Sequence, residues 1–147
     1  PHTSNWDFVL GIAGVFAVGV RVSFLGKHTL FRGVTGRMMR WLGGIPVDRR
    51  ASSGVVAQTV ELFEHSDSLI LGLSPEGTRS RVDRWRTGFY HIARGARVPI
   101  LPISFDYGRR VIAFGEPLQV GADMDADMAV LQGFFEGVSG RKAWSAG

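Results

Sequence analysis

Residues 68–80 read SLILGLSPEGTRS, in which a continuous apolar run leads directly into a polar loop with glycine and arginine. A continuous apolar run bounded by polar residues is typical of a strand that is covered on both faces, as in parallel sheets. Open α/β sheets bind their ligands at the carboxyl ends of such strands. We therefore predict a strand over residues 68–73 and a ligand-binding loop after it.

On both sides of this stretch the apolar spacing alternates between the period of helices and that of strands, as an α/β domain requires. Helices are predicted over residues 7–19, 34–42, 53–65, 87–96 and 123–138. Further strands are predicted over residues 20–25, 98–105 and 111–114. We expect residues 1–147 to form a single α/β domain whose mostly parallel central sheet has helices on both faces and its site at the strands' carboxyl ends.

The composition suits a globular domain that needs no covalent or metal cross-link. The chain has 147 residues, of which 45% are hydrophobic and 20% charged, and it has no cysteine. The lack of cysteine excludes thiol nucleophiles, thiolate metal sites and disulfide scaffolds. The net charge of +4, with arginine supplying most of the basic residues, suits an anionic partner. Nucleic acid, a phospholipid surface and a phosphorylated small molecule all meet that description.

The amino-terminal part shows neither a signal peptide pattern nor a spanning segment. The longest uncharged apolar stretch, residues 8–20, has 13 residues, whereas a spanning helix needs about 20. The chain begins directly on polar residues that could take part in catalysis or binding. We therefore expect that an upstream segment is missing.

His2 and Asp7 have the H-x4-D spacing, which a turn from a loop into a helix can bring together. A carboxylate that holds one imidazole nitrogen fixes the tautomer, so that the other nitrogen can accept a proton from an attacking hydroxyl. The pair is therefore a candidate general base with its orienting partner. The alternative is that Asp7 only caps the following helix.

The loop after the central apolar run has the chemistry of an anion site. Gly77 permits close approach of the backbone, and the hydroxyls of Thr78 and Ser80 can donate hydrogen bonds. The planar fork of Arg79 can bind two phosphate oxygens. The alternative is a solvated surface turn.

Four blocks, in this order, resemble the glycerolphosphate acyltransferase family of the PlsC-like type, which forms phosphatidic acid. The blocks are residues 2–7 (HTSNWD), 44–49 (GIPVDR), 76–80 (EGTRS) and 98–103 (VPILPI). Each block alone is a weak signal, but the ordered set, with EGTRS at its centre, is specific. It covers residues 1–103, and the resemblance implies that the missing upstream segment includes a strand leading into His2.

The resemblance implies an acyl transfer in which His2 is the general base and Asp7 orients it. The acceptor hydroxyl would attack the thioester of acyl-CoA or acyl carrier protein directly, without an acyl-enzyme. Gly77, Thr78 and Arg79 would hold the phosphate of the acceptor. Glu76 would order the loop, and Arg49 would supply a second cation.

The resemblance also implies partners and a location. The acceptor would be a lysophospholipid, 1-acylglycerol 3-phosphate above all, and no metal or resident cofactor is expected beyond the acyl donor. The protein would act peripherally at the cytoplasmic face of a bacterial membrane, without nucleic acid. Two alternatives stay open: a His-Asp hydrolase of a phosphorylated or thioester substrate, and a non-catalytic lysolipid-binding module.

Two further groups of residues allow more than one interpretation. Lys27 and His28 follow a predicted strand and belong either to a surface turn or to a phosphate contact. Trp85, Phe89 and Tyr90 either pack in the core or line an acyl groove or membrane interface.

Overall fold

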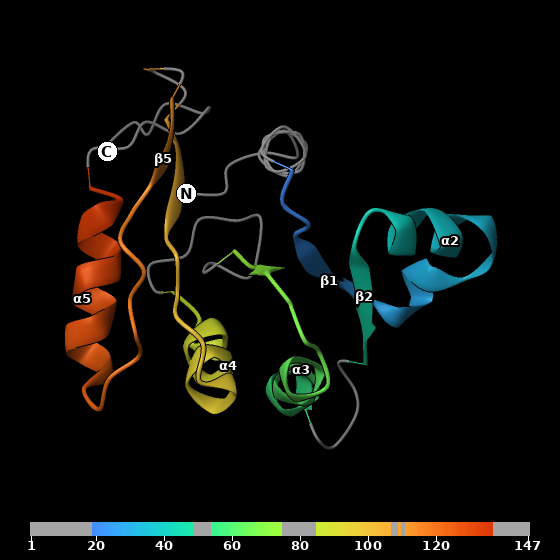
Figure 1. The fold of residues 1–147 in the computed structure, drawn as a ribbon, viewed down its shortest axis with the longest axis horizontal. Helices are drawn as coiled ribbons and strands as arrows, with labels where there is room; N and C mark the ends of the chain where they lie inside the picture. The colour runs from blue at the N-terminus through green and yellow to red at the C-terminus, as the bar shows by residue number, and fades with distance from the viewer. Residues whose placement is uncertain (1–18, 49–53, 75–84, 107–108, 110, 137–147) are drawn as a thin grey trace, which may run out of the picture. The chain divides into compact units, whose positions relative to one another are not determined.

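The computed structural model describes residues 19–48, 54–74, 85–106, 109 and 111–136 (Figure 1). These residues fall into two compact units. The amino-terminal unit contains the described residues up to 73, and the carboxyl-terminal unit contains those from 74 onward. Each unit is described by itself.

A parallel sheet organises the described part of the amino-terminal unit. Its strands are β1 (Ser23–Lys27), β2 (Gly44–Val47) and β3 (Leu71–Gly72). Their order is β2-β1-β3, and both neighbours pair with β1 in parallel. Because all three strands run the same way, their carboxyl ends lie at the same edge of the sheet.

Helical segments connect these strands. A 3-10 turn, η1 (His28–Phe31), and helix α2 (Gly33–Trp41) lead from β1 to β2, and helix α3 (Gly54–Glu64) lies between β2 and β3. The first connection leads from β1 to the strand on one side of it, β2, and the second connection leads back past β1 to the strand on its other side, β3. Right-handed crossovers then place α2 and α3 on opposite faces, and Figure 1 shows them on either side of β2.

Phe31 packs against the sheet where glycines leave room for its ring. It is buried, with 7% of its surface exposed. A Cβ atom added at Gly26 of β1 would lie 2.7 Å from the Phe31 ring, and one at Gly44 of β2 would lie 3.0 Å from it. A Cβ at Gly36 of α2 would overlap the backbone carbonyl of Phe31. The guanidinium of Arg40 lies 5.6 Å from the ring centroid, so the ring joins both strands and α2.

The described part of the carboxyl-terminal unit contains two helices and an antiparallel strand pair. Its elements are α4 (Gly88–Ala96), β4 (Ile103–Asp106), β5 (Val111–Phe114) and α5 (Met124–Phe134). Helix α4 ends at Ala96, and its C-cap residue Arg97 has a φ of 56°, in the left-handed region. Asp123 caps α5 by accepting hydrogen bonds from the backbone N–H groups of Asp125 and Ala126, at 3.0 and 3.1 Å. Such a cap satisfies donors that have no partner within the helix.

A buried tyrosine ties α4 to the start of α5. Tyr90 is fully buried, and its hydroxyl donates a hydrogen bond to the Oδ2 of Asp127 at 2.9 Å. The same oxygen accepts the backbone N–H of Gly121 at 2.7 Å. Burial, and then the hydrogen bond to Asp127, raise the pKa of Tyr90 above its ordinary value of 10.0.

The α/β class and the parallel sheet with helices are confirmed. The helices expected from apolar spacing are found as α2, α3, α4 and α5, with ends that differ by a few residues where they are described. The helix expected over residues 7–19 lies outside the described residues, apart from Gly19, which lies in a turn. Whether the chain is one domain stays a prediction.

The expected strands differ more from the structure. The strand expected over residues 20–25 is shifted to β1, and the one over residues 68–73 is reduced to the two residues of β3. The one over residues 98–105 begins only at β4, because Pro99 and Pro102 lack the N–H that a ladder needs. Strand β5 is found as predicted, but it pairs with β4 in a separate antiparallel sheet.

No strand was predicted over the residues of β2. Gly43 and Gly44 are typical of a helix end, and proline is rare inside a sheet. In the described part of the sheet β2 is an outer strand with only β1 as a neighbour, and proline is tolerated at such an edge. The position of β2 in the sheet therefore explains how Pro46 fits.

Candidate functional site

The carboxyl edge of the parallel sheet is the place where this fold would bind a ligand. Strand β1 leads into His28, β2 into Asp48, and β3 into Leu73. Because β2 and β3 lie on opposite sides of β1, the connections of the chain diverge there, and α/β sheets bind ligands at such switch points. The edge is thus the candidate site.

The site residues predicted from the sequence lie outside the described residues. They are His2, Asp7, Arg49, Glu76, Gly77, Thr78 and Arg79. Their roles and mutual geometry stay predictions. The structure describes the framework from which two of the loops leave: β2 with Asp48, one residue before Arg49, and β3, four residues before Glu76.

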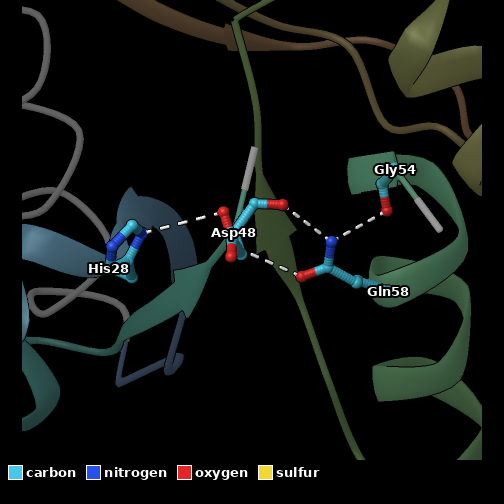
Figure 2. A network of polar contacts seen from close by, with 4 residues as sticks. All are labelled: His28, Asp48, Gly54 and Gln58. Carbon is cyan, nitrogen blue, oxygen red and sulfur yellow. Dashed lines mark hydrogen bonds and ion pairs between the residues drawn. The ribbon is translucent and has the colours of Figure 1, made fainter. Parts of the chain in front are cut away.

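The exit of β2 is held by one side chain of α3. The backbone N–H of Asp48 donates to Gln58 Oε1 at 3.1 Å, and Gln58 Nε2 donates to the Asp48 carbonyl at 2.8 Å (Figure 2). Nε2 also donates to the carbonyl of Gly54 at 3.0 Å. One amide group thus satisfies both backbone polar groups of Asp48, as a neighbouring strand would. The chain direction is fixed at the residue before Arg49.

His28 faces the same exit from β1. Its Nδ1 lies 3.9 Å from Oδ1 of Asp48, and Figure 2 shows the imidazole turned toward that carboxylate. The distance is too long for a hydrogen bond, so the contact is an ion pair only when the imidazole is protonated. Nδ1 is buried and has no hydrogen-bond partner among the described residues. The interpretation of His28 as a phosphate ligand stays a prediction.

The two hydrogen bonds between the Gln58 amide and the Asp48 backbone, which we call the Gln58 clamp, were not predicted. The His28–Asp48 contact was not predicted either. Gln58 lies in the middle of a helix and belongs to no motif, and its partners are backbone atoms, which no residue pattern shows. His28 and Asp48 are 20 positions apart and meet only because β1 and β2 are parallel neighbours. A polar residue among the apolar positions of α3 was the one available signal.

The aromatic residues that follow the predicted phosphate loop pack within their own unit. The rings of Trp85 and Phe89 lie edge to face at 6.1 Å between centroids, and Trp85 and Phe135 do so at 5.4 Å. With Tyr90 fully buried, the prediction of core packing is confirmed for that residue. These ring contacts fix the position of Trp85, the first described residue after the loop.

The described part of the chain contains neither a candidate metal site nor a candidate spanning helix. No group of three or more His, Asp or Glu side chains there could hold a metal ion. None of the helices described is long and apolar enough to cross a bilayer.

Comparison with known proteins identifies the family. Residues 1–106 match a family model described as acyltransferase. The match covers more than half of the chain, and the chain belongs to this acyltransferase family, whose members resemble glycerolphosphate and 1-acylglycerol-3-phosphate acyltransferases. The resemblance read from the four blocks is thereby confirmed. Neither the curated proteins nor the solved structures contain a match to the chain.

Proposed function

We propose that this acyltransferase moves a fatty acyl group from acyl-CoA or acyl carrier protein to the hydroxyl of a lysophospholipid. The preferred acceptor would be 1-acylglycerol 3-phosphate, and the product phosphatidic acid. One observation supports the proposal: β2 and β3, the strands from which the chain runs into two of the family blocks, end at the same edge of a parallel sheet. Residues 44–49 begin with β2 itself, and residues 76–80 start four residues after β3 ends.

The chemistry requires one base and one leaving thiol. His2, oriented by Asp7, accepts the proton of the acceptor hydroxyl as its oxygen attacks the thioester carbonyl carbon. The new C–O bond forms, the C–S bond breaks, and the departing thiolate takes the proton from His2. Protons balance, and the base returns to its neutral state for the next turnover.

Phosphate recognition would orient the acceptor for this attack. Arg79 would bind phosphate oxygens through its fork, with Gly77 and Thr78 donating from the loop and Glu76 ordering it. Arg49 would add a second cation. The Gln58 clamp supports this assignment, because it fixes the backbone of the residue that precedes Arg49.

The test is product analysis by mass spectrometry with acyl-CoA and a panel of phosphorylated and unphosphorylated lysolipids. Acylated lysophosphatidate as the main product would support the proposal. Free fatty acid without an acylated acceptor would indicate the hydrolase instead. Binding of lysophosphatidate without any turnover would indicate a lysolipid-binding module. We further propose that the reaction takes place at the cytoplasmic face of a bacterial membrane, to which the protein attaches peripherally.

A further inference from the structure

Helix α2 has large apolar side chains on one exposed face. Val34, Met38 and Trp41 have 79%, 51% and 78% of their surface exposed. At 100° per residue their positions fall within about 60° of one another around the helix axis. We call these three residues the α2 stripe.

The stripe points away from the sheet. Helix α2 is described throughout, and Gly36 is its one buried residue. Gly36 is the position that packs against Phe31. It lies roughly 140–160° around the helix from the members of the stripe. A surface helix normally has its apolar residues on the covered face, so α2 has the reverse arrangement.

The segment that contains the stripe is basic. Residues 19–47 contain no Asp or Glu, while their basic residues are Arg21, Lys27, Arg32, Arg37 and Arg40. Arg37 and Arg40 belong to α2 itself, and Arg32 is its N-cap residue. A helix with an exposed apolar face that includes tryptophan, flanked by arginines, is typical of helices that lie in the interface of an anionic bilayer.

The charge also argues against a second copy of this chain as the partner. In a symmetric dimer through α2, each copy would bring the same arginines to the contact without any carboxylate from this segment to pair with them. Like charges facing each other would oppose such a contact. Lipid phosphates, in contrast, supply the missing negative charge.

We propose that α2 is the surface by which this protein docks on an anionic phospholipid bilayer. Val34, Met38 and Trp41 enter the interfacial region, and Arg37, the α2 arginine next to the stripe around the helix axis, pairs with lipid phosphates. The choice of a bilayer rests on the proposed function, because its acceptor and product are membrane lipids. The surface itself rests on exposure and charge.

The experiment is flotation of the purified protein with vesicles of phosphatidylcholine that contain about 30% phosphatidylglycerol, compared with phosphatidylcholine alone. The stripe variant replaces Val34, Met38 and Trp41 with glutamine, which keeps helix propensity. Its matched control is Val130→Gln, at a residue of α5 with 63% of its surface exposed. Circular dichroism checks that each variant is folded.

Wild type and Val130→Gln should float with the anionic vesicles. The stripe variant should bind at least about tenfold more weakly, because each large apolar side chain contributes on that order when buried. Arg37→Gln should lower binding about fivefold on anionic vesicles, and the control Arg94→Gln in α4 should leave it unchanged. Quenching by brominated lipids should reach Trp41 and disappear in Trp41→Phe.

Three results of the binding measurements would overturn the proposal. They are full vesicle binding by the stripe variant, equal losses in the stripe variant and its control, and a wild-type dimer that the stripe variant dissociates while vesicle binding is unchanged. Acyl transfer separates this inference from the proposed function. If vesicle binding depends on the stripe but no transfer is detected, docking stands and the enzyme assignment fails. If transfer to vesicle-bound acceptor is equal in wild type and stripe variant, docking fails and the enzyme assignment stands.

Discussion

Replacing Gly36 with alanine tests how α2 is seated. The added Cβ would overlap the carbonyl group of Phe31 and lie 2.9 Å from its Cα. All three atoms belong to the backbone, so no side-chain rotation can relieve the overlap. Either α2 must move outward or the η1 turn must shift, and both movements disturb the packing of the Phe31 ring between β1 and β2.

The expected magnitude follows from two opposing effects. Overpacking of a tight site costs up to about 3 kcal/mol. Alanine recovers about 1 kcal/mol relative to glycine within a helix. The free energy of unfolding should therefore fall by about 2 kcal/mol, which lowers the Tm by roughly 6–8 °C for a chain of this size.

Gly133 in α5 provides the matched control. A Cβ added there would meet no atom within 4 Å, and its φ is not positive. Gly133→Ala should therefore raise the free energy of unfolding by about 0.5–1 kcal/mol. Urea titrations followed by circular dichroism measure both changes. If Gly36→Ala is as stable as wild type, or if both alanines shift stability in the same direction, the packing described for Phe31 is wrong.

Four further outcomes are expected. His2→Ala should lower kcat about 10²- to 10⁴-fold with little change in acceptor binding, as steady-state kinetics would measure. Arg79→Ala should lower kcat/KM about ten- to hundredfold for phosphorylated acceptors only, and Arg79→Lys should not restore it; equal losses on unphosphorylated acceptors would make the residue structural. Gln58→Glu removes the amide donor to Asp48 and should raise KM for the phosphorylated acceptor about tenfold with kcat unchanged; a fall in kcat alone would contradict the positioning role. Because the pKa of Tyr90 is raised in the folded chain, its contribution to stability should be complete below about pH 10, the pKa of an unfolded tyrosine, and should decline as the pH rises above that value through the raised pKa of the folded chain; the decline should be absent in Tyr90→Phe when urea titrations are repeated from about pH 9 upward.

The sequence by itself determined the family and most of the helices. Apolar spacing gave α2 to α5, because a helix with one covered face repeats its apolar residues every three or four positions. The four ordered blocks identified the acyltransferase family, since residues that carry chemistry are recognised by type and spacing. Neither inference depends on which residues are in contact in the folded chain.

Only the tertiary structure decided which groups meet at the sheet edge. Strand β2 was hidden by Gly43, Gly44 and Pro46, whose effect depends on whether the strand lies inside the sheet or at its edge. The Gln58 clamp acts on the backbone of Asp48, and backbone groups are the same at every residue. A sequence therefore records the donor side chain but not its partner.

The α2 stripe shows the same limit. The helical period places Val34, Met38 and Trp41 on one face of α2, and all three are exposed in the structure. The period does not determine whether that face is covered, because the covering surface is contributed by other parts of the chain. Here the buried side of α2 is marked by Gly36, which has no side chain that an apolar pattern could detect, and so the apolar residues are the ones left exposed.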